Sequence, residues 1–215
     1  MSSSPPERGR FITLEGSEGS GKTTAARHLA EWLQRGGTRT VLTKEPGGTP
    51  LGEEVRRLVL HVRGMSDDLD PRADALLYAA ARAQHVSRVI RPALERGDWV
   101  VCGRYADSSL AYQGAGYGND LTEMRRLQDF ATYGVRPDLT MLIDVPIEIG
   151  LERTRRRAEW NRFEDTEAVA FFRQVRDAYL ALAAEDPDRW RVVDGSGSVE
   201  AADLAIRQAV APLLA

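Results

Sequence analysis

The chain is organised around residues 16–23, which read Gly16-Ser17-Glu18-Gly19-Ser20-Gly21-Lys22-Thr23. Just before them lies Phe11-Ile12-Thr13-Leu14-Glu15, a short apolar run of strand type, and just after them apolar residues recur at helical spacing. A glycine-rich turn that joins a strand to a helix is the context that a phosphate-binding P-loop requires. The alternative, a flexible Gly/Ser loop, does not account for the full spacing together with both flanks.

The residue types in this loop suit a nucleoside triphosphate. Glycines let backbone N–H groups turn inward around phosphate oxygens, and the helix N-terminus adds its dipole and unpaired donors. Lys22 can reach the β- and γ-phosphates, and the Thr23 hydroxyl can hold Mg²⁺. The predicted ATP-binding residues are Gly16, Ser17, Glu18, Gly19, Ser20, Gly21, Lys22, Thr23 and Thr24.

Length and composition narrow the classes of protein to consider. The 215 residues suit one domain, and the formal net charge of -3 argues against binding of a nucleic-acid polymer. No apolar run approaches the length of a membrane span. The single Cys102 fits a reducing cytosol and is expected in the core rather than as a nucleophile. Residues 1–9 are polar and are expected to form a flexible arm.

Apolar runs and helical stripes alternate along the rest of the chain. Such alternation predicts a parallel α/β sheet with helices on both faces. Ligands of such sheets bind at the carboxyl ends of the strands, so the residues just after each strand are the informative ones. The predicted strands are 11–15, 40–43, 99–102, 139–144 and 190–194.

Two arginines could bind a second anionic group opposite the P-loop. Arg104 directly follows a predicted strand, and Arg56 lies on the helix after the second loop. The planar guanidinium binds phosphate through two hydrogen bonds. The alternative for each is a solvated surface arginine.

A nucleobase pocket is suggested by two polar sets. Tyr78 and Arg82 are four residues apart and share a helix face, where a ring could stack on a base and a guanidinium could bind its edge. A packed Tyr beside an exposed Arg would give the same pattern. The second set, which could bind a base and a sugar, is Ser108, Ser109, Tyr112 and Gln113. Serines that cap a helix start explain this set in part.

An arginine-rich helix end is a candidate lid. Arg153 and Arg157 share a helix face, and a polar stretch follows them. Lid arginines would neutralise charge on a transferring phosphoryl group. The alternative is a basic, solvated helix end, which also suits the helix dipole. His61 and His85 show no metal-ligand spacing, and His28 is expected to be a surface or packing residue.

Several stretches together, and in the right order, resemble the bacterial thymidylate kinase family. The Glu-Pro-Gly-Gly-Thr and Ser-Ser-Leu-Ala-Tyr-Gln pieces are far more specific than a P-loop, and the resemblance runs from about Phe11 to the C-terminus. The matching stretches are Phe11–Gly16 with the P-loop, Glu45–Thr49, Arg82–His85, Arg104–Gly114, Arg162–Glu164 and Phe171-Phe172.

The resemblance implies a P-loop kinase fold over residues 10–215, with a small lid at about 153–166. It implies transfer of the ATP γ-phosphoryl group to dTMP with Mg²⁺, giving dTDP and ADP, by a cytoplasmic homodimer packed through helices. Two alternatives stay open. One is a kinase for another pyrimidine nucleoside monophosphate, and the other is a catalytically weakened nucleotide-binding homologue.

The resemblance also implies a role for individual residues of the dTMP site. Tyr78 takes the place of the ring that stacks on thymine, and Arg82, Ser109 and Gln113 that of the hydrogen-bonding groups. Tyr112 takes the place of a tyrosine that disfavours ribose. The implied dTMP-binding residues are Glu18, which would meet the sugar 3′-OH, Lys44, Pro46, Arg56, Tyr78, Arg82, Arg104, Ser109, Tyr112 and Gln113.

The catalytic charge is implied to lie partly in the lid, because this P-loop lacks the arginine that some members carry. The implied metal ligands are Thr23 and the lid acid Glu164. The loop at 194–199 lies where the family passes the adenine. The implied catalytic residues are Lys22, Arg104, Arg153 and Arg157.

The chain departs from the family pattern at three positions. Lys44 replaces a usual arginine, and Asn161 a usual aspartate before Arg-Phe-Glu. Gly103 stands where the family normally has Asp, and a glycine holds neither a metal-bound water nor an acceptor phosphate. Either Glu15 or Asp144 compensates, or turnover is reduced, or this is an altered copy.

Overall fold

The computed structural model describes residues 8–62, 69–156 and 166–214. The described residues contain one five-stranded sheet in the order β2-β3-β1-β4-β5, and every neighbouring pair is parallel. This confirms the predicted α/β class. The strands are β1 (Phe11–Glu15), β2 (Thr40–Lys44), β3 (Trp99–Gly103), β4 (Leu139–Asp144) and β5 (Trp190–Asp194).

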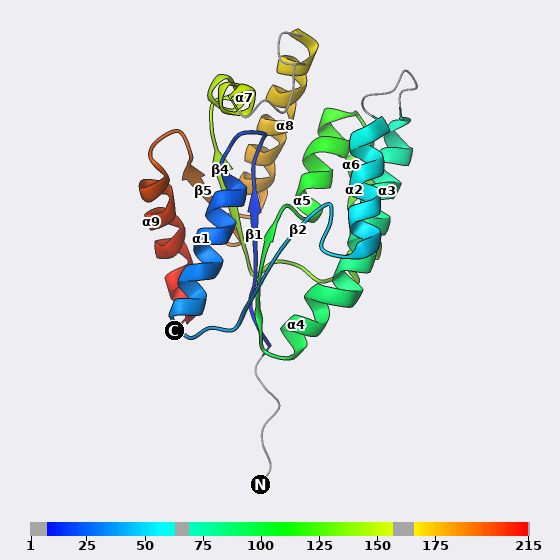
Figure 1. Ribbon diagram of the computed structural model, residues 1–215. Helices are drawn as coiled ribbons and strands as arrows, with labels where there is room; N and C mark the ends of the chain where they lie inside the picture. The colour runs from blue at the N-terminus through cyan, green and yellow to red at the C-terminus, as the bar shows by residue number, and fades with distance from the viewer. Residues whose placement is uncertain (1–7, 63–68, 157–165, 215) are drawn as a thin grey trace.

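Helices connect the strands and cover both faces of the sheet (Figure 1). They are α1 (Lys22–Arg35), α2 (Pro50–Val62), α3 (Pro71–His85), η1 (Val86–Ile90), α4 (Arg91–Glu95), α5 (Ala106–Ser109), η2 (Leu110–Gly116), α6 (Leu121–Thr132), α7 (Ile147–Arg155), α8 (Thr166–Glu185), α9 (Val199–Val210) and η4 (Ala211–Leu214). Helix α1 packs beside α9 on one face, with α8 on the other, while α2, α3 and α6 form a group at one edge.

The central strand β1 sends alternate side chains to the two faces, as strand geometry requires. Ile12 and Leu14 join the core under α1 and α9, whereas Phe11 joins a separate core with residues of η1 and α4. Thr13 and Glu15 point to the same face as Phe11 and are fully buried. Two polar side chains therefore stand in the middle of the sheet, and they need partners there.

Two helical segments were not expected in this form from the sequence. The helix that begins at Pro71 passes through the π-helical turn η1 and continues as α4. Residues 106–116, expected as a loop or a helix start, form the short helix α5, which continues as the π-helical segment η2. In each π segment the backbone hydrogen bonds span five residues instead of four, so the side chains that follow are rotated relative to those of a regular α-helix.

The carboxyl ends of the strands meet at one edge of the sheet, the upper edge in Figure 1. The loop between β1 and α1 lies there, against α7. Among the described residues, no helix combines the length and the apolar character needed to cross a membrane.

Candidate active site

The P-loop, residues 16–23, forms the turn between β1 and α1. Gly21 caps α1 with a φ of 94°, a left-handed conformation that glycine adopts without strain. The Lys22 side chain is buried, and its ammonium group donates a hydrogen bond to the Ser17 carbonyl at 2.9 Å, so it is held over the loop. Thr23 is exposed in the first turn of α1, and its hydroxyl makes no hydrogen bond to a described residue.

Helix α7 packs its backbone directly on this loop. A Cβ atom on Gly19 would lie 2.0 Å from the carbonyl oxygen of Gly150, and a Cβ on Gly150 would lie 2.5 Å from that of Glu18. No side chain fits at either position without moving the backbone. The loop is thus fixed by contact of backbone with backbone.

Arg104 follows β3 and reaches the P-loop from the opposite side. Its Nη2 donates to Glu18 Oε1 at 2.8 Å and to the Tyr112 hydroxyl at 3.0 Å, and its Nη1 donates to the Gly16 carbonyl at 3.2 Å. The guanidinium also lies 4.8 Å from the centre of the Tyr112 ring. The backbone of Arg104 has a φ of 67°, which a non-glycine residue rarely adopts. A cation is therefore held at the junction between the P-loop and η2.

Glu15 lies beneath Arg104 and supports it. The Glu15 carboxylate accepts hydrogen bonds from the Tyr105 backbone N–H at 2.7 Å, the Ser108 hydroxyl at 2.6 Å and the Tyr179 hydroxyl at 3.0 Å. The same two hydroxyls each lie 3.3 Å from Nη1 of Arg104. Glu15 thus holds both the backbone after Arg104 and two of its side-chain partners.

Burial changes the protonation of Glu15. Its pKa is raised to about 7, first by the loss of water around a fully buried carboxyl and then by repulsion from Asp107. Hydrogen bonds from Ser108 and Tyr179 and the charge of Arg104 act in the opposite direction. A group that titrates near neutral pH is therefore coupled to the arginine at the centre of the site.

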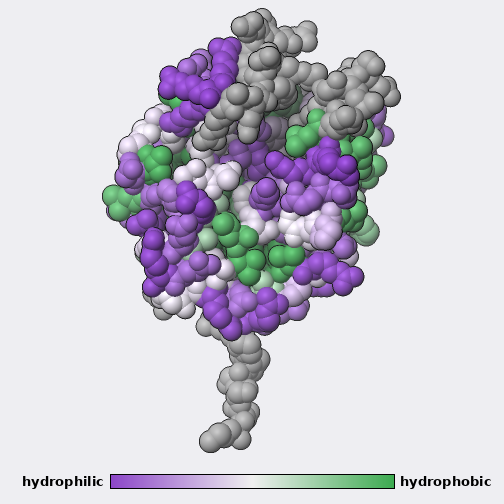
Figure 2. Space-filling view, in the orientation of Figure 1, coloured by the Kyte–Doolittle hydropathy of each residue, from purple (hydrophilic) through white to green (hydrophobic). Residues whose placement is uncertain are grey.

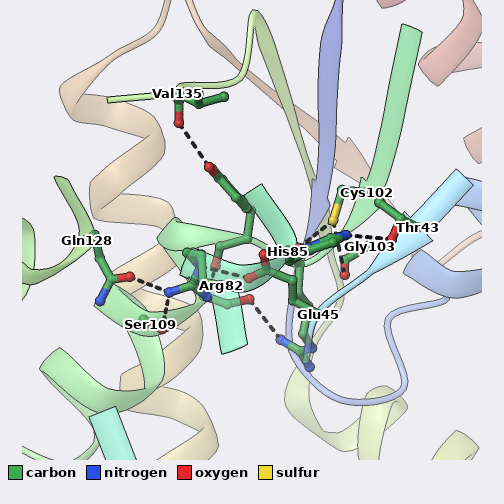
Figure 3. Close-up of polar contacts among 12 residues, drawn as sticks. Thr43, Glu45, Arg82, His85, Cys102, Gly103, Ser109, Gln128 and Val135 are labelled. Carbon is green, nitrogen blue, oxygen red and sulfur yellow. Dashed lines mark hydrogen bonds and ion pairs between the residues drawn. The ribbon is translucent and has the colours of Figure 1, made fainter. Parts of the chain in front are cut away.

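Arg82 lies at the middle of a second, buried network (Figure 3). Its Nε donates to Glu45 Oε2 at 2.7 Å, and its Nη1 donates to the Ser109 hydroxyl at 2.9 Å and to Gln128 Oε1. Its Nη2 donates to the Tyr105 carbonyl at 3.0 Å, and the side chain is only 1% exposed. The network joins α3, α5, α6 and the loop after β2, and a contact of Arg82 with a base stays a prediction.

His85 extends this network to the sheet. Its Nδ1 lies 2.9 Å from Glu45 Oε1, and its Nε2 lies 2.7 Å from the Thr43 hydroxyl (Figure 3). A Cβ on Gly48 would lie 2.5 Å from the same imidazole. The loop after β2 is therefore held against α3 by one buried carboxylate, Glu45, that bridges Arg82 and His85.

The remaining residues of the predicted dTMP site lie around these networks. Nη1 of Arg56 donates to the Pro46 carbonyl at 3.4 Å, and Lys44 is exposed at the end of β2. Tyr78 is half-buried on α3, and Gln113 is buried on η2. Their roles in binding stay predictions.

The lid prediction lies partly outside the described residues. Arg153 on α7 donates to the Gly195 carbonyl at 2.8 Å and to the Ser196 carbonyl at 3.3 Å, so it joins α7 to the loop after β5. Arg157, Asn161 and Glu164, with most of the predicted lid, lie outside the described residues.

The two carboxylates suggested as substitutes at Gly103 have other partners. Glu15 is held as described above, and Asp144 accepts two hydrogen bonds from Arg176, at 2.7 and 2.8 Å. The position itself is open: a Cβ on Gly103 would meet only the Cβ of Lys44, at 3.8 Å. A carboxylate thus fits at Gly103, while Glu15 and Asp144 both have other hydrogen-bond partners.

Two further expectations concern single residues. Cys102 is fully buried in β3, and burial raises the pKa of its thiol, so a reactive thiolate is disfavoured. His28 lies 2.6 Å from Asp203 and so joins α1 to α9. Both residues lie within the packing of the fold, as expected. The side chain of His61 is outside the described residues.

Several supporting residues were missed from the sequence. In the sequence, Glu45 falls only within a matching stretch, His85 shows no metal-ligand spacing, and Tyr179 on α8 belongs to no motif. No local pattern marks Tyr179, because its hydroxyl meets a residue 164 positions away. No local pattern marks Glu45 either, because a glutamate before Pro-Gly-Gly is expected to be exposed, and its burial is a property of the fold.

Comparison with known proteins gives a consistent picture. A sequence model described as thymidylate kinase matches residues 14–206. The chain is 49% identical over 206 residues to a thymidylate kinase of Alkalilimnicola ehrlichii, with 95% of this chain and 93% of the relative covered. It is 46% identical over 218 residues to one of Roseiflexus castenholzii, with 95% and 94% covered. The crystal structure of thymidylate kinase from Ehrlichia chaffeensis is similar with a TM-score of 0.76 and 33% identity, covering 94% of this chain and 99% of that one.

Proposed function

The chain belongs to the thymidylate kinase family, and we propose that its site transfers the γ-phosphoryl group of ATP to dTMP, giving dTDP and ADP. The observation that carries the proposal is the position of Arg104, 2.8 Å from the P-loop acid Glu18 and 3.0 Å from the Tyr112 hydroxyl. A guanidinium at this junction can contact phosphates on both sides. The names of the relatives do not favour a kinase for another monophosphate.

The P-loop half binds the donor. Its backbone N–H groups and the N-terminus of α1 face the triphosphate, and Lys22 places its ammonium group against the β- and γ-phosphates. An Mg²⁺ ion fits here because the Thr23 hydroxyl is exposed and makes no hydrogen bond to a described residue. When bound, such an ion neutralises charge on the phosphates. Glu164, the second predicted ligand, lies outside the described residues.

The opposite half binds the acceptor. Arg56 and Arg104 hold the dTMP phosphate, Tyr78 stacks on thymine, and Ser109 and Gln113 bind its edge. Glu18 meets the sugar 3′-OH, after exchanging its contact with Arg104 for one with substrate. Lys44, Pro46, Arg82 and Tyr112 complete this half.

The chemical step needs little covalent work by the protein. An oxygen of the dTMP phosphate is already anionic at neutral pH, so no strong base is required to activate it. Lys22, Arg104, Arg153 and Arg157 stabilise charge on the phosphoryl group as it moves between oxygens, and the bound geometry brings the two phosphates into line.

We also infer a homodimer. Large apolar side chains are exposed on the helices grouped at one edge of the sheet, and Phe130 on α6 is 83% exposed. Hydrophobic residues are visible where α2 and α3 lie (Figure 2). The exposed set on these helices is Leu51, Leu58, Leu60, Leu76, Leu121 and Phe130. Light scattering that gives the mass of one chain would contradict the dimer.

A steady-state assay tests the reaction. With Mg·ATP in excess, phosphorylation of dTMP is compared with that of dUMP, dCMP and AMP. We expect the highest kcat/KM for dTMP, and equal or higher values for another monophosphate would contradict the proposal. Replacement of Lys22 by Ala in the same assay separates this enzyme from a contaminating kinase.

The Gly103→Asp variant tests the missing carboxylate. It should fold, since the added Cβ meets only Lys44 at ordinary contact distance. Glu15 and Asp144 have other partners, so the added carboxylate is expected to raise turnover by about tenfold, which corresponds to about 1.4 kcal/mol in the barrier. An unchanged rate would show that Gly103 does not limit this chain.

A further inference from the structure

Helix α3 and the helix formed by α5 and η2 are joined by two side-chain contacts. Near one end Nη1 of Arg82 donates to the Ser109 hydroxyl at 2.9 Å, and near the other Nε2 of Gln113 donates to Asp74 Oδ2 at 2.9 Å. Asp74, Tyr78 and Arg82 follow one another at four-residue spacing on α3, and Ser109 and Gln113 are also four apart. The half-buried Tyr78 therefore lies between the two contacts.

The Asp74 contact determines which way the Gln113 amide faces. A carboxylate accepts hydrogen bonds and donates none, so the amide group turned toward Asp74 must be the NH₂. Both side chains are buried, with 3% of Asp74 and 2% of Gln113 exposed. The backbone carbonyl of Gln113 also accepts a bond from Asn119 Nδ2 at 2.7 Å, so the main chain is held as well.

The other end of the amide is left as an acceptor. Oε1 of Gln113 accepts no hydrogen bond from any described residue, although the residue is almost fully buried. This oxygen is not among the fully buried atoms without a partner, so it is open to a ligand, and a ligand group that pairs with it must be a donor. A base stacked on Tyr78, as proposed above, would lie between the two contacts and could supply that donor.

We propose that Asp74 is a positioning residue that sets base selectivity by holding Gln113 with its carbonyl oxygen toward the base. This rests on the proposed function. Thymine and uracil carry a donor at N3–H, which matches the carbonyl. Cytosine carries an unprotonated N3, so two acceptors would face each other and the carbonyl would stay unpaired beneath the base. Asp74 thus excludes cytosine without touching the base.

The Asp74→Asn variant tests this because it keeps the shape and removes the constraint. The new amide can donate as well as accept, so Gln113 can turn over and present its NH₂ to the base. We expect the ratio of kcat/KM for dTMP to that for dCMP to fall about tenfold or more, as an unmatched polar group in a site costs at least this. The kcat/KM for dUMP should fall together with the kcat/KM for dTMP, because both bases carry the N3–H donor.

A second variant reverses the pair. Asp74→Asn combined with Gln113→Glu again places one amide against one carboxylate, with the donor now on α3. The new carboxylate presents only acceptor oxygens to the base, so the ratio should return to within about threefold of the wild type. The matched control is Asp70→Asn, on the exposed N-cap residue one turn earlier, where Asn caps equally well.

The outcomes separate a selective role from a structural one. If Asp74→Asn lowers kcat/KM for dTMP and dCMP equally, Asp74 only supports the fold and the proposal is overturned. If that variant does not fold by circular dichroism, the double variant decides, and a ratio far from the wild-type value overturns the proposal. If the wild type phosphorylates no dTMP, the proposed function is wrong, and the same ratios are then measured as dissociation constants by calorimetry.

Discussion

The two halves of the site are held in place by different kinds of contact. The P-loop half, residues 16–23 with α7, is fixed by backbone against backbone, as at Gly19 and Gly150. The α3 half, around Arg82, is fixed by buried side chains, among them Glu45 and His85. The first kind of contact tolerates no added atom. The second kind tolerates no missing partner, because it holds charges away from water.

This difference separates two ways of damaging the protein. Loss of a partner in the α3 half leaves a buried charge unpaired, so its main cost is in stability. An atom added in the P-loop half displaces donors from phosphates, so its main cost is in turnover. Three substitutions test the contrast, beginning with the largest expected effect.

Arg82→Met should destabilise the fold most. Among the described residues, the Glu45 carboxylate would keep His85 as its one ion-pair partner, and breaking a buried ion pair in this way costs about 3–5 kcal/mol. Urea unfolding followed by circular dichroism measures the loss. The control is Arg125→Met, which breaks an exposed pair with Glu185 and should cost less than about 1 kcal/mol. Equal losses in the two variants would contradict the role given to the α3 half.

Gly150→Ala should damage catalysis more than stability. Alanine favours a helix, yet its Cβ would lie 2.5 Å from the Glu18 carbonyl, so the P-loop must move. A shift of about 1 Å costs about 100-fold in turnover. We expect kcat/KM for ATP to fall by that factor, while dTMP affinity measured by calorimetry without ATP falls much less, because only one proposed dTMP contact, Glu18, lies on the P-loop.

The control for this variant lies on the same helix. Glu152→Ala replaces an exposed residue whose partner is Arg156, and it should leave kcat/KM for ATP within about threefold of the wild type. A loss of dTMP affinity equal to the loss for ATP in Gly150→Ala would show that the halves are not held independently.

Glu15→Gln tests the contact between the P-loop half and the α3 half, because Glu15 supports Arg104, which lies between them. The pKa of Glu15 is about 7 in the folded protein, above its ordinary value of 4.5, so the folded state binds the proton more tightly. Stability is therefore lost as pH rises from below 5 through 7. Relative to the variant, the wild type should lose about 2 kcal/mol between pH 5 and pH 7.

Urea unfolding of both proteins at pH 5, 6 and 7 provides the measurement. A constant difference across the three pH values would mean that Glu15 is ionised throughout, and that burial does not act on it as described. The pH dependence of kcat should change in the same window if Arg104 is held through this carboxyl.

The strands and the P-loop could be predicted because their signals are contiguous. Residues 139–144 and 190–194 form strands with the predicted bounds, and β1 is also as predicted. Strands β2 and β3 each extend one residue further, to Lys44 and Gly103, which are register partners. A lysine and a glycine give no strand signal, so only pairing with the neighbour reveals the last rung.

The helices on the α3 side were harder to predict. Residues 106–116 are small and polar, and their helix is stabilised by burial against α8 and α6 rather than by propensity. Which polar residues gather there could be proposed from a resemblance, but their partners could not. The buried acceptor Glu45 and the hydroxyl of Tyr179 came only from the structure.

The sequence by itself determined the P-loop between β1 and α1, the order of strands and helices, and the family of the chain. These depend on residues close together along the backbone, where spacing limits the conformations that are allowed. Only the tertiary structure decided that Glu15 lies under Arg104, that Glu45 bridges Arg82 and His85, and that Asp74 turns Gln113. Each of these contacts joins residues that are 37 or more positions apart, and packing of whole elements, not local spacing, brings them together.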